Sequence, residues 1–340
     1  MDGVEQTPVS IVIPTYNREH FITRAVKSVI SQCSADDEII IVDDGSVDET
    51  QTIIMPFQDR VKYIKVENGG AGKARNIGVR FAKNPLVAFL DSDDEWMPMK
   101  LTLQRALMTA HPEIVFSFSD IAVRFHWGAD IRCFLRHRYK DREIGKRILG
   151  KGVPFSSLAA LPEHVSDFLV HIGDLYHAEM ANSHVATSTM VVRRERANEG
   201  RLFAEDLPTY EDWECFGRLS RKGVAAYLDL ETAWLHHHQE PQLTKTDGFT
   251  AVCSRLILMF RVWGQDPEYL SKHRAEFEKI VNEQRMIRIK NLLSRKHFRE
   301  AKREISKSSN IPIPYRILAS MPPLALQAVM SARKFFYRVN

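Results

Sequence analysis

The first hundred residues alternate between short apolar runs and segments whose apolar positions recur at helical spacing. Residues 9–13, VSIVI, form a β-branched run of the kind that fills a buried parallel strand. In residues 22–30 the apolar side chains recur every three to four positions, which predicts an amphipathic helix. The alternation continues with strands predicted in 37–46, 61–67 and 85–94, and with a helix predicted in 69–83. Alternating strands and helices predict an α/β fold with a mostly parallel sheet flanked by helices.

The turns of this region supply candidate helix caps. Asn17 stands shortly before the helix predicted in 22–30, and Ser46 and Asp48 stand before the helix that follows the second strand. Asn, Ser and Asp side chains accept hydrogen bonds from the free N–H groups of a first helical turn. We therefore expect Asn17 to cap the first helix, and Ser46 or Asp48 to cap the second.

The second half of the chain is patterned less regularly. Further strand-like segments surround a basic insertion that has no clear period, at about 124–180. These segments are residues 116–120, 186–194 and 223–238. From about Asp266 onward the chain has the pattern of long, charged helices. The sequence thus predicts an α/β domain in residues 1–245 and a helical region in residues 246–340.

Composition restricts the class of protein. The 340 residues are 44% hydrophobic and 26% charged, as in a soluble globular protein. The four cysteines lie far apart without a CxxC pair, which argues against a disulfide framework or a structural zinc site. The first eight residues lack the basic and apolar regions of a signal peptide. The longest uncharged run, 317–332, contains two prolines and is shorter than the ~20 residues of a membrane span. We therefore expect a cytoplasmic protein.

The net charge of +4 is unevenly distributed. Residues 272–307 hold 12 Lys and Arg against 5 Glu, and residues 124–151 hold 9 Lys and Arg against 3 acids. Such stretches indicate an anionic partner. A base-reading motif is missing and the glutamates interrupt the basic helices, so we do not expect nucleic acid to be that partner.

Three of the predicted strands end in polar clusters. These are Pro14–Asn17, Asp43–Asp44 and the run Asp91–Asp94, which holds three carboxylates in four positions. In open α/β sheets, ligands bind beyond the carboxyl ends of the strands. The clusters should therefore meet at one edge of the sheet. A dinucleotide site is excluded because the turn after the first strand, PTYNRE, has no glycine, and no P-loop motif is present.

Four segments, in this order and spacing, resemble the family 2 glycosyltransferases of GT-A fold. They are VSIVIPTYNRE, IIIVDDGSVDET, NGGAGKARNIG and VAFLDSDDEW. The resemblance is strong over residues 8–105 and weaker to about 245, through YEDWE and a run of histidines. It implies a bacterial-type enzyme of cell-surface polysaccharide synthesis that transfers a sugar, with inversion, from a nucleotide donor. The donor would be a UDP-sugar, and the acceptor a hydroxyl of a glycan, a glycolipid or a lipid-linked saccharide.

The resemblance also implies the residues that hold the donor. The base and ribose would be bound by Pro14, Thr15, Tyr16, Asn17 and Asp44. A tyrosine ring can stack on a base and a carboxylate can accept from a base N–H; a packing tyrosine and a turn-forming aspartate are the alternatives. Lys73 and Arg75 stand where cations could approach the diphosphate, or they lie on a helix surface without contact to ligand.

By the same resemblance, Asp91 and Asp93 form a DxD motif that binds Mn²⁺ or Mg²⁺, with Ser92 contacting the donor. Hard oxygen ligands suit these ions. The alternative is an acidic turn that caps a helix beginning near Trp96. A histidine of the run His236–His238 would complete the metal site, and we favour His238.

The catalytic base implied by the resemblance lies in the segment PTYEDWECF. Asp212 matches the position of the base, which removes the proton of the acceptor hydroxyl, and Glu211 supports the site or the acceptor. Alternatively, both acids only complement the N-terminus of a helix. Two other protein classes stay open: a sugar-nucleotide pyrophosphorylase, although its glycine-rich loop is missing, and a non-catalytic module that binds nucleotide sugars.

The end of the chain offers a possible membrane contact. Residues 324–339 combine Leu, Val and Phe with three basic residues, a composition suited to a helix that lies at a membrane surface. We expect peripheral association with anionic lipid at the inner membrane face. The alternative is a tail that packs on the α/β domain or on a second subunit of a homo-oligomer.

Overall fold

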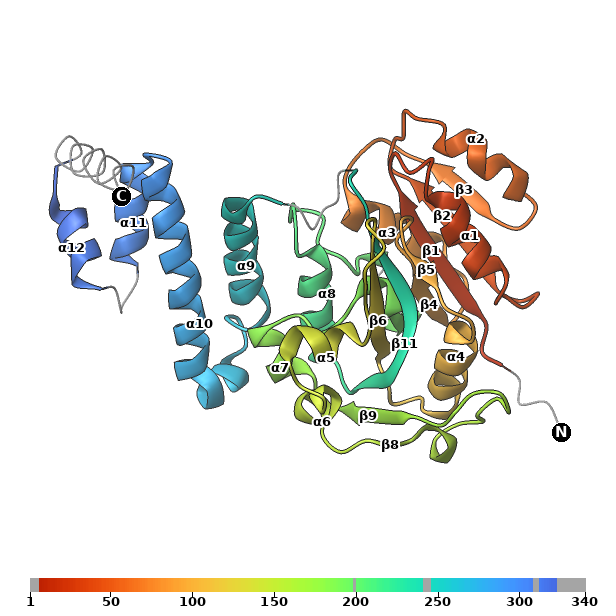
Figure 1. Ribbon diagram of the computed structural model, residues 1–340. Helices are drawn as coiled ribbons and strands as arrows, with labels where there is room; N and C mark the ends of the chain where they lie inside the picture. Colours follow the sequence, from red (N-terminus) through yellow and green to blue (C-terminus); the bar gives the residue numbers. More distant parts are fainter. Residues whose placement is uncertain (1–5, 198–199, 241–245, 308–311, 323–340) are drawn as a thin grey trace. The chain divides into compact units, whose positions relative to one another are not determined.

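The computed structural model describes residues 6–197, 200–240, 246–307 and 312–322 (Figure 1). Contacts within the chain divide it into two compact units. The first unit is Met1–Leu207 with Glu211–Pro241, and the second is Pro208–Tyr210 with Gln242–Asn340.

The first unit is an α/β domain. Its strands are β1 (Val9–Thr15), β2 (Glu38–Asp43), β3 (Lys62–Lys65), β4 (Leu86–Phe89), β5 (Glu95–Trp96), β6 (Phe116–Phe125), β7 (Asp130–Ile131), β8 (Val153–Pro154), β9 (Leu169–Gly173), β10 (Val191–Arg193) and β11 (Ala225–His237). Its α-helices are α1 (Ile22–Ile30), α2 (Thr50–Ile54), α3 (Ala71–Phe81), α4 (Lys100–Ala110), α5 (Phe134–Tyr139), α6 (Ile144–Leu149), α7 (Tyr176–Ala181) and α8 (Glu211–Ser220). Short 3₁₀ helices are η1 (Met55–Phe57), η2 (Phe155–Ser157), η3 (Thr187–Thr189) and η4 (Arg194–Arg196).

One mixed sheet runs through this unit, with the strand order β3-β2-β1-β4-β10-β6-β11-β9-β8. β1 is parallel to β2 and β4, and β10 is antiparallel to both β4 and β6. Because β6 is in turn parallel to β11, the strands β1, β2, β4, β6 and β11 all run in one direction. Their carboxyl ends therefore share one edge of the sheet, which we call the rim. The mostly parallel α/β fold is confirmed.

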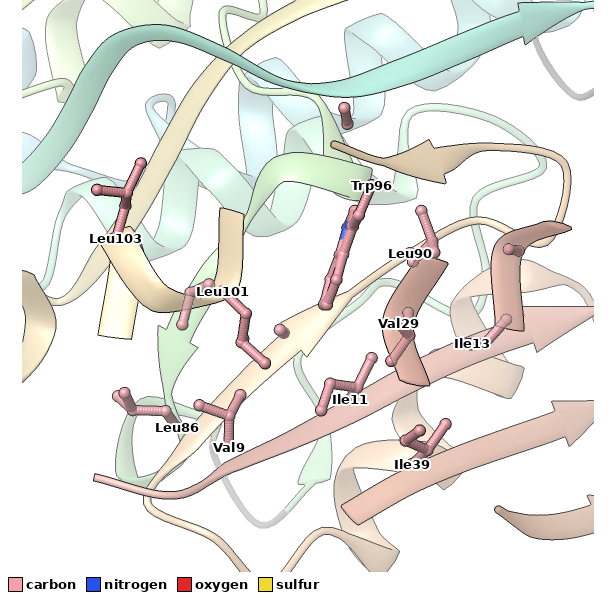
Figure 2. Packing of buried hydrophobic residues seen from close by; sticks show 14 of the residues in the cluster. Val9, Ile11, Ile13, Val29, Ile39, Leu86, Leu90, Trp96, Leu101 and Leu103 are labelled. Carbon is pink, nitrogen blue, oxygen red and sulfur yellow. The ribbon is translucent and has the colours of Figure 1, made fainter. Parts of the chain in front are cut away.

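Strand β1 is buried on both faces of the sheet, which explains its unbroken apolar run. Ile11 and Ile13 belong to one hydrophobic cluster, together with Val29 of α1 and Trp96 (Figure 2). Val12, between them, points to the opposite face and packs with residues of α3. There Gly78 of α3 is needed, since an added Cβ would lie 2.2 Å from Cγ1 of Val12.

The loop after β1 is held across the rim and not by a helix cap. The prediction that Asn17 caps α1 is wrong: the N-cap residue is Phe21, and Asn17 has a φ of 50°. Its side chain instead accepts from the backbone N–H of Val47 at 3.0 Å. The prediction of Ser46 or Asp48 as the N-cap of α2 is also wrong, since that residue is Glu49. Ser46 accepts from the N–H of Asn17 at 2.9 Å, and Asp48 accepts from the N–H of Thr50, the first residue of α2.

The basic insertion contributes to the sheet. It holds β7, α5, α6, β8, β9 and α7, and its strand β9 pairs antiparallel with β11 through residues 170–173 and with β8 on its other side. Pairing with an existing edge strand stabilises this short segment, although its sequence, LVHIG, has too few residues to display a period. The insertion thus extends the sheet beyond β11.

The second unit is helical, as predicted. Its helices are α9 (Gly248–Val262), α10 (Pro267–Ser294), α11 (Phe298–Ser306) and α12 (Ile313–Ser320). Asp247 caps α9 by accepting from the N–H groups of Phe249 and Thr250. A small core joins α10 to α11 through Ile289, Leu292 and Ala301. Among the described residues, the helices are all too short or too polar to cross a bilayer. The predicted interfacial segment 324–339 lies outside the described residues.

Candidate active site

The acidic run follows β4 directly and folds back as a turn at the rim. The backbone N–H of Asp94 donates to the carbonyl of Asp91 at 3.0 Å. Ser92 and Asp94 are buried, whereas the side chain of Asp91 is 32% exposed. The turn therefore offers Asp91 to solvent and holds Asp94 inside the protein.

Asp93 lies against His238. Its Oδ2 is 3.0 Å from Nε2 of His238 and 3.2 Å from Nε of Arg18. Burial acts to raise the pKa of Asp93, but the hydrogen bond with His238 and the charge of Arg18 outweigh it, so this pKa lies below its ordinary value. Asp93 is therefore a carboxylate at neutral pH.

The three histidines at the end of β11 have different surroundings. Only His238 contacts Asp93, and its ring stacks on Phe21 with 4.2 Å between the ring centroids. His236 lies 3.2 Å from a carboxylate oxygen of Glu95, and His237 stacks on Phe125. Because side chains alternate along a strand, neighbouring histidines point to opposite faces.

Arg75 connects two of the candidate carboxylates. Its Nη2 donates to Asp91 at 2.6 Å and its Nη1 donates to Glu211 at 2.9 Å. Burial acts to lower the pKa of Arg75, but Asp91 and Glu211 together raise it above its ordinary value. The arginine is therefore charged and neutralises part of the acidic rim. Gly72 allows this approach, since an added Cβ would lie 2.7 Å from the carbonyl oxygen of Ala204.

Asp212 lies in the first turn of α8, beside Glu211. Its Oδ1 accepts from the N–H of Trp213 at 2.7 Å, and the hydroxyl of Thr187 lies 3.4 Å from its Oδ2. Burial, and then the charge of Glu211, raise the pKa of Asp212 to about 7, against the opposing charge of Arg75. The side chain is only partly covered. A carboxylate with this pKa is suited to take up a proton near neutral pH.

The candidate nucleotide-binding residues gather at the ends of β1 and β2. Asp44 accepts from the N–H groups of Gly69 and Gly70, both at 2.8 Å, and so shapes the glycine turn before α3. Lys73 folds over this turn, since a Cβ added to Gly69 would meet its Cδ at 2.3 Å. Tyr16 is 45% exposed next to the buried end of β1, which holds the last two candidates, Pro14 and Thr15. Arg18, one residue after Asn17, joins this group to Asp93.

Two residues of η3 that the motifs do not include connect the acidic turn to the base candidate. Ser188 donates to Asp94 at 2.5 Å and accepts from the N–H of Asp91 at 3.2 Å. Its neighbour Thr187 contacts Asp212. Asp94 is buried and hydrogen-bonded to Ser188, so it supports the turn from inside; burial, and then the charges of Asp93 and Asp91, raise its pKa. Ser188 and Thr187 both belong to the polar triplet at 187–189, which precedes the apolar run of β10.

Replacing Ser188 by alanine is expected to loosen the acidic turn. The change removes a hydrogen bond to a carboxylate and leaves the N–H of Asp91 without its acceptor. We expect about a tenfold rise in the Mn²⁺ concentration that gives half-maximal nucleotide binding. Titration of the metal at fixed UDP checks this. The matched control is Ser119→Ala, a buried serine that bonds to Thr232 within the sheet. An equal shift in both variants would contradict the assigned role.

The acidic turn and His238 hold carboxylate and imidazole groups of the kind that bind divalent metal ions. Oδ2 of Asp93 and Nε2 of His238 lie 3.0 Å apart. Adjacent ligands on an octahedral ion, with bonds of about 2.1 Å, stand about 3 Å from each other. Two carboxylates and an imidazole suit Mn²⁺, and carboxylates suit Mg²⁺. Asp93 and His238 therefore have the spacing of two ligands of such an ion, while Asp91 does not lie close enough to both to complete a three-residue cluster among the described residues.

Residues 10–158 of the chain match the family model described as Glycosyl transferase family 2. Among curated proteins, a UDP-Glc:α-D-GlcNAc-diphosphoundecaprenol β-1,3-glucosyltransferase of Escherichia coli, WfgD, is 41% identical over 102 residues, which are 29% of this chain and 40% of that protein. A putative teichuronic acid biosynthesis glycosyltransferase of Bacillus subtilis, TuaG, is 28% identical over 64% of this chain and 74% of that protein. The first curated relatives are matched over only 30 to 40% of their own length.

Solved structures share the fold. The structure of S. aureus TarS in complex with UDP-GlcNAc superposes with a TM-score of 0.56 at 18% identity, over 82% of this chain and 71% of that chain. The mannosyltransferase PcManGT from Pyrobaculum calidifontis, in complex with GDP-Man and Mn²⁺, gives a TM-score of 0.53 at 14% identity, over 99% of this chain and 89% of that chain. At these identities the likeness concerns the fold alone.

Proposed function

Because residues 10–158 belong to glycosyl transferase family 2, we propose that this chain is an inverting, metal-dependent glycosyltransferase. It would transfer a sugar from a nucleotide donor to a hydroxyl of a glycan or lipid-linked acceptor. The observation that carries the proposal is the convergence at one rim of an Asp93–His238 pair, 3.0 Å apart, and a carboxylate, Asp212, whose pKa is raised to about 7.

The donor would bind along the ends of β1 and β2. Tyr16 offers an exposed ring for the base, and Asp44, held by the glycine turn, offers a carboxylate. The names of WfgD and of the TarS complex contain UDP-sugars, which favours UDP over GDP for this chain as well. Lys73 and Arg75 supply positive charge for the diphosphate.

Asp91, Asp93 and His238 would hold Mn²⁺ or Mg²⁺. When bound, the ion neutralises the diphosphate that leaves the sugar. Ser188 and Asp94 support this turn from inside. Arg75 forms ion pairs with both Asp91 and Glu211 and so reduces the repulsion between the two carboxylates.

Asp212 would act as the base. Inversion requires that the acceptor oxygen attacks from the side opposite the leaving diphosphate, while a nearby group takes its proton. Asp212 is partly exposed, and burial together with the charge of Glu211 keeps its pKa raised. Thr187 and the N–H of Trp213 hold the carboxylate in place.

The acceptor would belong to the synthesis of a cell-surface polysaccharide. The names of WfgD and TuaG refer to a diphosphoundecaprenol-linked sugar and to teichuronic acid, respectively. A lipid-linked acceptor agrees with the proposed peripheral association at the inner membrane face. Self-association is a further proposal, and size-exclusion chromatography with light scattering would test it.

Nucleotide binding tests the donor site. Calorimetric titration of UDP, GDP, ADP and CMP into the protein should give binding of UDP in Mn²⁺ that is at least about tenfold weaker in excess chelator. Equal affinity for all four nucleotides, or UDP binding unaffected by the chelator, would contradict the proposal.

The raised pKa of Asp212 predicts the pH dependence of transfer. The base must be ionised, so kcat/KM for transfer should fall about tenfold per pH unit below pH 7 and level off above it. A bound divalent ion adds positive charge, which would lower the pKa of Asp212 and move the fall in kcat/KM to lower pH. The profile from pH 5 to 9, measured beside UDP affinity as the control, checks this. A kcat/KM that rises as the pH falls from 7 to 5 would exclude Asp212 as the base.

A further inference from the structure

An aromatic cluster lies at the rim beyond the acidic turn. β6 ends at Phe125, and the hairpin to β7 carries Trp127, which is 64% exposed. The ring of Phe125 stacks on Trp127, with 4.5 Å between centroids, and also on His237, with 5.2 Å. Burying a tryptophan side chain is strongly favourable, so an indole that stays exposed gives up this stabilisation. An exposed indole held in place by stacking therefore indicates a binding surface.

The strand register places this cluster beside the candidate metal site. Phe125 is the register partner of His237, and His238 follows with its contact to Asp93. The N–H of His126 donates to the carbonyl of His237 at 3.0 Å and fixes the hairpin to the end of β11. The cluster therefore lies at the same edge of the sheet as the donor-binding candidates; Figure 1 shows β6 and β11 ending together there.

The strand order separates the cluster from the nucleotide. β2 and β1, with the candidates for the base and ribose, lie on one side of β4, and β6 and β11 lie on the other. The acidic turn follows β4, between them. A donor whose base lies over β1 and whose diphosphate lies at the acidic turn directs its sugar toward β6 and β11. The group that receives the sugar must approach from that side.

The chemistry of the cluster matches a sugar ring. A pyranose has one face of C–H groups, which stacks on an aromatic ring, and a rim of hydroxyls that need hydrogen bonds. Polar groups stand around the cluster: His126 lies 3.2 Å from Gln239, and Arg124 is paired with Asp130 at 3.0 Å. We infer that Trp127, supported by Phe125 and His237, forms the subsite that binds a sugar ring of the acceptor. This inference rests on the proposed function, since it assigns the acceptor side of the same site.

Saturation-transfer NMR with simple sugars tests the subsite without turnover. The probes are the methyl glycosides of glucose, N-acetylglucosamine, galactose and mannose. Wild-type protein should saturate the ring protons of at least one probe. Trp127→Ala should weaken its binding about tenfold or more, and Trp127→Phe, which keeps a ring, less than about threefold. The matched control is Phe81→Ala, an aromatic residue that is 43% exposed at the end of α3 remote from the rim.

Metal-dependent UDP binding, measured on the same samples, separates this inference from the proposed function. Trp127-dependent sugar binding without UDP binding would refute the donor site and keep the subsite. Unchanged sugar binding in Trp127→Ala, or no saturation of any probe by the wild type, would overturn the subsite. A third outcome would overturn the subsite in favour of a membrane contact. In that outcome the wild type binds no sugar but binds vesicles with anionic phospholipid, and Trp127→Ala loses the vesicle binding.

Discussion

Replacing Asp93 by alanine is expected to reduce sugar-nucleotide turnover at least about a thousandfold. The substitution removes the carboxylate that faces His238 and Arg18, and with it a ligand of the proposed metal ion. Stabilisation of a leaving diphosphate by such an ion amounts to several kcal/mol, and each 1.4 kcal/mol corresponds to about tenfold in rate. Release of nucleoside diphosphate, with and without Mn²⁺, measures the effect.

The matched control for this change is Asp141→Ala. Asp141 is a partly exposed carboxylate of the same unit that also pairs with an arginine, Arg147, but it lies in the loop between α5 and α6. It should turn over donor at the wild-type rate. Full activity of Asp93→Ala, or of the wild type in excess chelator, would refute the metal role.

Replacing Asp212 by asparagine is expected to lower transfer by about a hundredfold to ten-thousandfold and to leave UDP affinity within about twofold. Asparagine keeps the size of the side chain and an oxygen that can accept from the N–H of Trp213, but it cannot take a proton at neutral pH. Parallel measurement of kcat and of UDP binding in Mn²⁺ separates the two effects.

A different outcome would assign Asp212 another role. If UDP affinity fell together with the rate, the carboxylate would be a binding or folding residue. Glu214→Gln, two positions further along the first turn of α8, is the control, because Glu214 is a buried carboxylate that pairs with Arg218. Its substitution should change neither kcat nor UDP affinity by as much as tenfold.

The strands and their common rim follow from local pattern. Ile11, Val12 and Ile13 had to be buried on both faces of a sheet, and that requirement predicts parallel strands covered by helices. The polar clusters at the strand ends then predict that the ligand-binding residues meet at one edge of the sheet. The strand β9 could not be predicted, because its five residues show no alternating hydrophobic pattern. The pairing with β11 stabilises it instead.

Contacts between residues far apart in the sequence limit how much of the site can be predicted from the sequence. Arg75 and Glu211 are separated by 136 positions in the sequence. The sequence around either residue does not indicate that the guanidinium of Arg75 binds both Glu211 and Asp91. If the alternation of β11 continues one residue past its end at His237, His236 and His238 lie on one face, so the pattern narrows the candidate metal ligand to these two histidines. The choice between them depends on the pairing of β11 with β5, which brings Glu95 to His236. His238 is then the histidine that contacts Asp93.

Ser188 was missed for a related reason. Its environment depends on the antiparallel return of β10 between β4 and β6, which brings residues 97 positions apart in the sequence into contact at the acidic turn. Serine and threonine before an apolar run are common in loops. The triplet therefore carries no functional signal until the sheet order is known.

Chromatographic analysis of the nucleotides formed from sugar nucleotides tests the central claim most directly. The wild-type protein, incubated with UDP- and GDP-sugars in Mn²⁺, is predicted to release nucleoside diphosphate from at least one of them, slowly with water as acceptor, and to stop when a chelator is added. Formation of nucleoside triphosphate when pyrophosphate is supplied would instead indicate a pyrophosphorylase. Intact donors after prolonged incubation, with UDP bound tightly in Mn²⁺, would contradict the account and indicate a module that binds nucleotide sugars without transferring them.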